Sequence, residues 1–157
     1  MTPRLLEDLK ADEGLRLAAY PDPATGAAPW TIGYGHTGPE VHPGLTWTEE
    51  QATSALHADV ERAVAGLDAD LPWWRTLDDV RQDVMAELCF NMGVGHPAQD
   101  GRPGHGLRAF VQTLNAIRAG RYAAAAEGLL ASHWARQVGA RAQRLAALMR
   151  TGARPAD

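Results

Sequence analysis

Glu13 and Asp22 are the residues of this chain whose types and spacing could perform acid–base chemistry. One carboxylic acid can give a proton to a leaving group while a second carboxylate activates a water molecule, and hydrolytic reactions use this division of roles. Acidic residues are common in this chain, so the spacing alone favours two solvated surface charges. The neighbours are more informative, because a glycine and an apolar stretch follow Glu13 and prolines flank Asp22 on both sides.

Helix and turn signals predict how these two carboxylates are held. Leucines at helical spacing, with Thr2-Pro3 as a start and Gly14 as a stop, predict a first helix that Thr2 caps and Glu13 ends. The C-terminus of a helix carries partial negative charge, which favours a protonated carboxyl and suits Glu13 as a proton donor. Asp22 lies in a turn, where it stays solvated and ionised, as a base partner requires.

Residues 15–37 have a different character. The stretch from Trp30 to Gly35 mixes aromatic and β-branched residues with glycine, and turn signals precede it. We predict a small antiparallel sheet with a tight bend near residues 23–28, followed by a loop over 38–47. The hydroxyl of Thr31 could hold a water molecule against Asp22, although β-propensity alone would also explain a threonine at this place.

From residue 48 onward the apolar period becomes helical. Thr48 and Gln51 form a capping box for a helix that runs to about residue 67 and could bridge two lobes. Thr76 with Asp79 starts another helix, a candidate for the centre of the core. Further helices are predicted over 107–119, 121–131 and 133–150, with Ser132 as a cap and Gly139 as a break in the last. Strands near one end and helices elsewhere predict an α+β fold.

Composition bounds the class of protein. With 157 residues and 45% hydrophobic side chains, the chain can form one domain, or two lobes around a shared core, and disorder is not expected. Cys89 is the only cysteine, which excludes an internal disulfide, and we expect it to be a small buried apolar residue. The N-terminus turns polar too early for an export signal, and no stretch reaches the roughly 20 apolar residues that cross a bilayer.

Charge is distributed unevenly along the chain. Residues 1–99 carry 6 basic and 16 acidic side chains, whereas residues 100–157 carry 9 arginines and 3 acidic side chains. A basic C-terminal half indicates contact with an anionic polymer or surface, such as nucleic acid, anionic lipid or a carboxylate-bearing cell wall. A solvated, arginine-rich helical face is an equally good interpretation.

Three runs of residues resemble the phage-type lysozymes, which are glycoside hydrolase family 24. They are Asp12-Glu13-Gly14-Leu15-Arg16-Leu17, then Tyr20 with Asp22, then Thr31-Ile32-Gly33-Tyr34-Gly35-His36-Thr37-Gly38. Further matches follow in order as far as Arg150-Thr151-Gly152, so the resemblance covers nearly the whole chain. It implies a lysozyme-like α+β fold in which a small antiparallel sheet lobe is joined by a long helix to a larger helical lobe. Residues 1–157 would form one lysozyme domain, with the sheet lobe over about 14–60 and the helical lobe over about 1–13 and 61–157.

The same resemblance implies a catalytic set of Glu13, Asp22 and Thr31. Members of this family hydrolyse the β-1,4 bond between N-acetylmuramic acid and N-acetylglucosamine in bacterial peptidoglycan, with inversion and without a cofactor or metal. An inverting mechanism needs two carboxylates separated by roughly 6.5–9.5 Å, so that a water molecule fits between them and the sugar. Positions that contact the substrate in the family correspond to Gly35, Thr37, Phe90, Thr113 and Arg141. Gly128 falls where the family has used a polar side chain, a contact that glycine cannot make.

The resemblance also bears on His36 and on two stretches of unusual length. In this family the histidine that corresponds to His36 pairs with an aspartate on the interlobe helix, which by position is Asp59. The stretch between Asp22 and Thr31 is about three residues longer than in the best-known members. Residues 94–106 form an insertion of roughly ten residues, a Gly/Pro-rich loop that could act as a flap near Phe90. The insertion contains His96, Asp100 and His105, whose spacing matches no strong metal-ligand pattern.

The biology implied by the resemblance is lysis of a bacterial host cell. The protein would be a monomer made in the host cytoplasm without a signal peptide, and a holin-type pore would release it to the wall in the periplasm. Peptidoglycan glycan strands are the expected partner; nucleic acid and stable membrane insertion are not expected. Two other functions remain open: a non-enzymatic wall-binding or membrane-disrupting protein that uses Arg141, Arg144 and Arg150, and a lytic transglycosylase, which needs an acid but no activated water.

Overall fold

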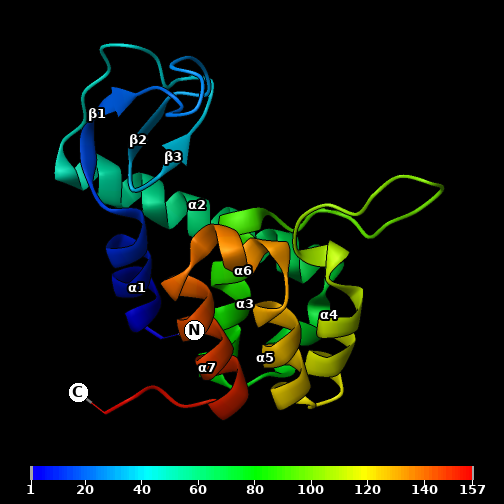
Figure 1. The fold of residues 1–157 in the computed structure, drawn as a ribbon. Helices are drawn as coiled ribbons and strands as arrows, with labels where there is room; N and C mark the ends of the chain where they lie inside the picture. The colour runs from blue at the N-terminus through cyan, green and yellow to red at the C-terminus, as the bar shows by residue number, and fades with distance from the viewer. Residues whose placement is uncertain (1, 157) are drawn as a thin grey trace. The chain divides into compact units, whose positions relative to one another are not determined.

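The computed structural model describes residues 2–156 and confirms the α+β architecture (Figure 1). The chain divides into two compact units. One unit is Pro3–Arg62, and the other comprises Thr2 and residues 63–156. Helix α1 therefore belongs to the unit with the sheet, whereas the sequence analysis grouped residues 1–13 with the helical lobe.

The unit Pro3–Arg62 begins with helix α1 (Arg4–Glu13). Gly14 ends the helix with a positive φ of 68°, which glycine adopts readily, and its N–H donates to the carbonyl of Lys10 at 3.0 Å, as the predicted glycine stop requires. The predicted cap is wrong: Pro3 stands at the cap position and makes no side-chain bond there. Thr2 belongs to the other unit, together with Asp83. Its N–H donates to the Asp83 carboxylate at 2.8 Å, and its hydroxyl donates to the same carboxylate at 2.5 Å.

The predicted small sheet has three antiparallel strands in the order β1-β2-β3. These are β1 (Arg16–Tyr20), β2 (Thr31–Gly33) and β3 (His36–Thr37). Tyr20 pairs with Thr31 and Arg16 with Gly33, so β1 holds an irregularity between its two paired ends. Between these ends, β1 is paired along its other edge, where Ala18 forms an antiparallel bridge with Thr46. The 38–47 segment is therefore tied to the edge of the sheet at its end.

Helix α2 (Glu49–Asp70) runs across the boundary between the two units. The predicted capping box at its start is confirmed, because the N–H of Thr48 donates to Gln51 Oε1 at 2.8 Å and the N–H of Gln51 donates to Thr48 Oγ1 at 3.2 Å. The helix ends three residues later than the sequence predicted.

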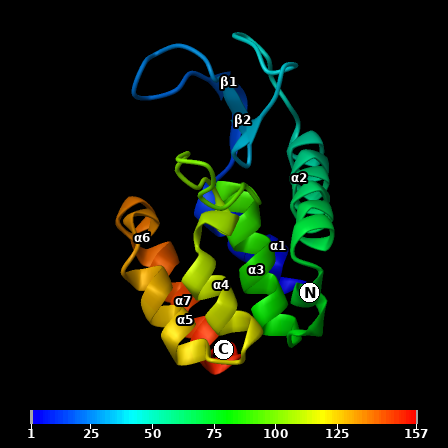
Figure 2. The ribbon, with the colours of Figure 1, turned by 90° about the vertical axis from the view of Figure 1, so that its right-hand side faces the viewer.

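The second unit is helical. It contains η1 (Pro72–Thr76), α3 (Asp79–Met92), η2 (Leu107–Ala109), α4 (Val111–Arg118), α5 (Tyr122–Leu130), α6 (His133–Val138) and α7 (Ala140–Thr151). Helix α7 packs against α3, α5 and α6, and α4 packs on α5 (Figure 2). Fully buried side chains such as Met85, Leu88 and Leu145 form the core, as expected of a central α3.

Caps decide where these helices begin. Ser132 caps α6 as predicted, with its Oγ accepting from the N–H of Ala135 at 3.2 Å, and Gly139 separates α6 from α7. Thr76 does not cap α3: its hydroxyl donates to the carbonyl of Trp73, and Asp78 caps the helix by accepting from the N–H of Arg81 at 3.0 Å. Both residues are good caps, so the sequence alone could not choose between them.

Cys89 is buried in α3, as predicted, with 4% of its surface exposed. Its thiol donates to the carbonyl of Ala63 at 3.4 Å. Burial, and to a smaller extent the charge of Asp70, raise the pKa of the Cys89 thiol to about 11. The thiolate is therefore scarce at neutral pH, and this side chain serves packing and not nucleophilic chemistry. Among residues 2–156, no helix is both long and apolar enough to cross a bilayer.

Candidate active site

Glu13 is placed at the end of α1 by the glycine stop that follows it, and its side chain is half-buried. Its carboxylate lies over Gly35, in the turn between β2 and β3. A Cβ atom added to Gly35 would stand only 2.6 Å from Glu13 Oε2 and 3.3 Å from its Cδ. Gly35 has φ of 72°, in the left-handed region. The sequence analysis interpreted this glycine as a place where the backbone approaches a sugar, and the structure places the Glu13 carboxylate against it.

Asp22 lies two residues beyond the end of β1, in a tight turn that its own backbone closes. Its N–H donates to the carbonyl of Ala27 at 2.9 Å, and its carbonyl accepts from the N–H of Gly26 at 2.8 Å. Its side-chain Oδ1 accepts from the N–H of Ala24 at 2.9 Å. This last bond uses one of the two carboxylate oxygens and fixes the direction of the side chain. The prolines that flank Asp22 thus belong to an ordered turn.

The register of β2 relates the two candidate carboxylates, Glu13 and Asp22, to each other. Thr31, at its start, pairs with Tyr20, the residue two before Asp22, and also with Thr37 of β3. Gly33, at its end, leads into the turn that carries Gly35 and the Glu13 carboxylate. Two residues of strand span about 7 Å. The register thus puts Thr31 near the Asp22 end of β2 and Glu13 near the opposite end.

His36 forms the pair with Asp59 that the resemblance implied, with 2.8 Å between His36 Nδ1 and Asp59 Oδ2. The structure adds a second partner that the sequence analysis missed: His36 Nε2 lies 2.5 Å from Glu40 Oε1. The imidazole is buried and also contacts the ring of Trp47, with 5.4 Å between the ring centres. Glu40 is four residues from His36 across a Gly-Pro turn, and this spacing outside a helix gives no contact signal.

The two carboxylates decide the protonation of His36. Burial of the imidazole opposes its charge, but the hydrogen bonds to Asp59 and Glu40 and the charges of these groups outweigh burial and raise the pKa of His36 above its ordinary value of 6.5. The same contact lowers the pKa of the exposed Glu40 carboxyl. The charged triad ties β3 and the 38–40 turn to α2.

Stability of this unit is therefore expected to depend on pH through His36. A group whose pKa is raised by folding stabilises the folded state fully below its unfolded value of about 6.5, and this contribution is lost as the pH rises through the folded value. Asp59→Asn removes one partner, so we expect the pKa of His36 to fall and the free energy of unfolding near pH 5.5 to fall by about 1–3 kcal/mol. Urea unfolding across pH 5–8 with NMR titration of the ring measures both. Glu50→Gln removes the same charge from an exposed site on α2, and equal effects of the two variants would contradict the assignment.

The remaining substrate-contact candidates belong to residues 63–156. Phe90 is half-buried near the end of α3. Thr113 is 8% exposed, and a Cβ on Gly128 would collide with its hydroxyl, so Gly128 allows α5 to approach α4 closely. Thr113 also lines a hollow of about 360 Å³ with residues 109–112.

Arg141 is held by a buried carboxylate. Its Nε donates to Glu87 Oε1 at 3.1 Å, and Arg144 Nη1 donates to Glu87 Oε2 at 3.2 Å. Glu87 is 1% exposed, so two guanidinium groups compensate its charge within the helical unit. The sequence analysis assigned Arg141 to substrate contact and gave both arginines a wall-binding role in an alternative function. It did not identify Glu87, which in the sequence is an ordinary polar position of α3.

A protein-family model and several phage proteins match this chain. The family model described as Phage lysozyme matches residues 10–154. A protein of Bacillus phage B103 named Endolysin is 39% identical over 90 residues, which cover 55% of this chain and 32% of that protein. An Endolysin of Acyrthosiphon pisum secondary endosymbiont phage 1 is 36% identical over 86 residues, or 55% of each chain.

A longer match covers 94% of this chain. It is the pre-baseplate central spike protein Gp5 of Enterobacteria phage T4, which is 30% identical over 173 residues, or 28% of its own length. The chain thus spans between 28% and 55% of the lengths of these relatives. The family model matches nearly the whole chain, including the helix, turn and strand that carry Glu13, Asp22 and Thr31, and its lysozyme-like α+β fold agrees with the elements described above. The chain therefore belongs to the phage lysozyme family.

Proposed function

We propose that this chain is an endolysin-type lysozyme that hydrolyses the β-1,4 bond between N-acetylmuramic acid and N-acetylglucosamine in bacterial peptidoglycan. The observation that carries the proposal is the position of the Glu13 carboxylate over Gly35 at one end of β2, with the Asp22 turn extending from the strand paired to the other end. Two acids held by segments next to opposite ends of β2 suit a reaction in which each acts at a different side of one bond.

In the proposed reaction, Glu13 protonates the glycosidic oxygen and the leaving sugar departs from an oxocarbenium-like transition state. Asp22 takes a proton from a water molecule that attacks the anomeric carbon from the opposite face, and the hydroxyl of Thr31 orients this water. An inverting pair requires roughly 6.5–9.5 Å between its two carboxyl groups, so that the attacking water fits between Asp22 and the sugar. One water is consumed and the anomeric configuration inverts.

Substrate contacts are proposed at Gly35 and Thr37 in the sheet and at Phe90, Thr113 and Arg141 in the helical unit. Gly35 contributes through its backbone, since the space beside its α-carbon holds the Glu13 carboxylate. Thr113 is expected to contribute least, because it is buried against Gly128. Arg141 offers a cation to peptide carboxylates of the wall only to the extent that Glu87 leaves its guanidinium edge accessible.

The setting of the activity follows from the names of two of the relatives, both called Endolysin. We propose that the protein lyses a bacterial host, acts as a monomer on the wall in the periplasm, and reaches the wall through a holin-type pore. No cofactor is required by the proposed chemistry, because the carboxylates supply both proton transfers.

Analysis of the products tests the reaction. Purified peptidoglycan digested in isotopically labelled water should give fragments that end in reducing N-acetylmuramic acid, each with one labelled oxygen. NMR of the fresh products should show the inverted anomer. Anhydromuramic ends would identify a lytic transglycosylase, reducing N-acetylglucosamine ends would identify a different bond, and a retained anomer would contradict the roles given to Asp22 and Thr31.

A further inference from the structure

Residues 94–106 form an ordered arm and not an irregular loop. His96 and His105 exchange two backbone hydrogen bonds of 2.9 Å, and Gln99 and Arg102 exchange two more of 2.9 and 3.1 Å. Asp100 and Gly101, both with positive φ, make the two-residue turn between the paired segments. Within its own unit the arm projects away from the helices (Figure 1).

Glycines fix the base of this arm. A Cβ on Gly95 would collide with the carbonyl oxygen of His105, and a Cβ on Gly106 would stand 2.8 Å from the carbonyl oxygen of Gly93. Below them, the N–H of Leu107 donates to Gly93 and the N–H of Arg108 to Val94, both at 2.9 Å. The close approach of the two backbones at these glycines holds the two segments in register at the base.

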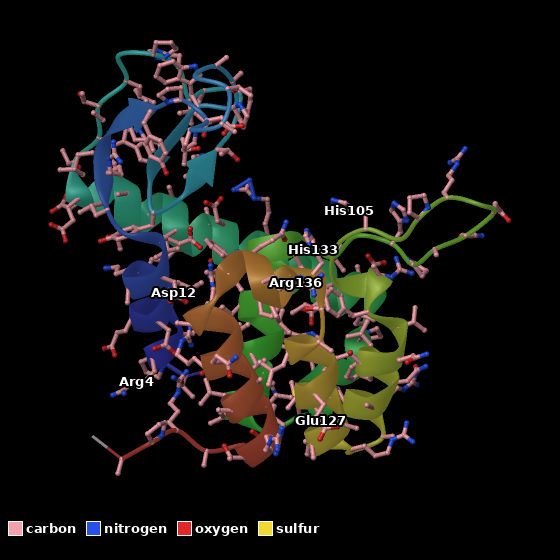
Figure 3. All side chains as sticks on the ribbon, in the orientation of Figure 1. Arg4, Asp12, His105, Glu127, His133 and Arg136 are labelled. Carbon is pink, nitrogen blue, oxygen red and sulfur yellow. The ribbon has the colours of Figure 1, made fainter. Side chains whose placement is uncertain are left out.

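This register places two histidines directly opposite each other. Residues that exchange both backbone bonds present their side chains on the same face of an antiparallel pair. The imidazole rings of His96 and His105 accordingly lie 6.3 Å apart between centres and are tilted by 30°. Both residues are exposed, and Figure 3 shows His105 near the base of the arm.

One ring already has the hydrogen bond that orients a metal ligand. His96 Nδ1 lies 3.1 Å from the carbonyl oxygen of Pro97, which can only accept, so Nδ1 carries the proton and Nε2 presents a lone pair. Histidines that bind metals usually donate the other ring N–H to a carbonyl or carboxylate in this way. An imidazole that binds a metal through nitrogen puts its ring centre about 3 Å from the ion. The separation of 6.3 Å between the two ring centres is about twice this distance, so one ion fits between the rings.

We propose that His96 and His105 form a two-histidine site for a divalent transition metal ion such as Zn²⁺ or Cu²⁺, with water in the remaining positions. Imidazole nitrogen suits these ions, whereas Mg²⁺ and Ca²⁺ prefer oxygen. Arg102 is three residues from His105, so strand alternation places its charge on the opposite face of the arm. The bound ion links the two segments beyond the glycines at their base and so rigidifies the arm. This inference is independent of the proposed hydrolysis.

His133 is an alternative partner for His105 in a metal site. It lines a hollow of about 580 Å³ together with His105, Phe110 and Trp134. Its Nδ1 accepts from Arg136 at 3.5 Å, and in the part of the chain that the structure describes, residues 2–156, no group of three or more histidine, cysteine or acidic side chains could hold a metal ion. The site is therefore assigned to the cross-strand pair.

Calorimetric titration of the tag-free protein with ZnCl₂ and with CuCl₂ tests the site. We expect one ion per chain, and a loss of affinity of about tenfold or more in His96→Ala and in His105→Ala, because each variant removes one of two ligands. His42→Ala is the matched control. His42 is also exposed and also donates Nδ1–H to the carbonyl of a following proline, at 2.9 Å, but among residues 2–156 its ring stacks on no other histidine.

A spectroscopic measurement decides which rings bind. Cu²⁺ broadens the NMR signals of nearby imidazoles, so the signals of His96 and His105 should disappear first and together. Equal affinity in the wild type and in the His96→Ala/His105→Ala double variant would overturn the proposal. Earlier broadening of another histidine would overturn it as well. Because both side chains are exposed, the variants are expected to keep the fold, which circular dichroism checks.

Discussion

Glu13→Gln is expected to lower the rate of peptidoglycan hydrolysis by about 10²–10⁴-fold, because the amide keeps the shape of the side chain but cannot give up a proton as an acid does. Asp22→Asn should cause a loss of the same order, since the amide cannot accept the proton of the attacking water. Clearing of permeabilised Gram-negative cells, followed as turbidity, measures both rates. Substrate binding should change much less than kcat, because the lost interaction belongs to the transition state.

The matched control for this prediction lies on the same helix. Glu7 is an exposed glutamate of α1, and Glu7→Gln removes an equal charge without touching the turn that carries Gly35. Its activity should stay within about twofold of the wild type, in line with the small effects of surface substitutions. Clearing by Glu13→Gln at the wild-type rate would remove Glu13 from the mechanism and favour a non-enzymatic, arginine-driven action on the wall or membrane.

Local rules predicted several of the helix ends. The glycine stop of α1, the Thr48 capping box and the Ser132 cap depend on residues within a few positions of each other, and each is found in the structure. The errors are also instructive. Thr2 bonds Asp83, 81 residues away, and a partner at that separation leaves no local pattern in one sequence.

The strand pairing within the arm and the contact of His36 with Glu40 were not predicted from the sequence either. The Asp100-Gly101 turn is a recognisable hairpin signal, but prolines and glycines on both sides of it concealed the pairing, so the segment was predicted as a loop. Glu40 reaches His36 only because Gly38 and Pro39 bend the chain between them. Sequence motifs thus identified the candidate acids. Contacts such as the one between His36 and Glu40 could be found only once the strands and turns were placed in space.

Gly35→Ala is expected to lower activity by about 10²-fold while most of the stability is kept. A Cβ at this position would stand 2.6 Å from Glu13 Oε2, which is the end of a flexible side chain, so the carboxylate moves and the backbone stays. A displacement of about 1 Å of a catalytic group is enough to cost about 10²-fold in rate. Alanine with φ near 72° also adds strain of about 1–2 kcal/mol, and thermal unfolding measures this part separately.

Gly44→Ala separates the two effects. Gly44 also has a positive φ, 85°, but a Cβ there would meet nothing within 4 Å. This variant should lose similar stability and keep its activity. Combining Gly35→Ala with Glu13→Gln gives the decisive comparison: if Gly35 acts by holding the Glu13 carboxylate in place, its substitution should cost little once the acid is gone, and the two losses should not add. Additive losses would mean that Gly35 serves the reaction by another route, such as backbone contact with the sugar, and that the position of the acid over this glycine is incidental.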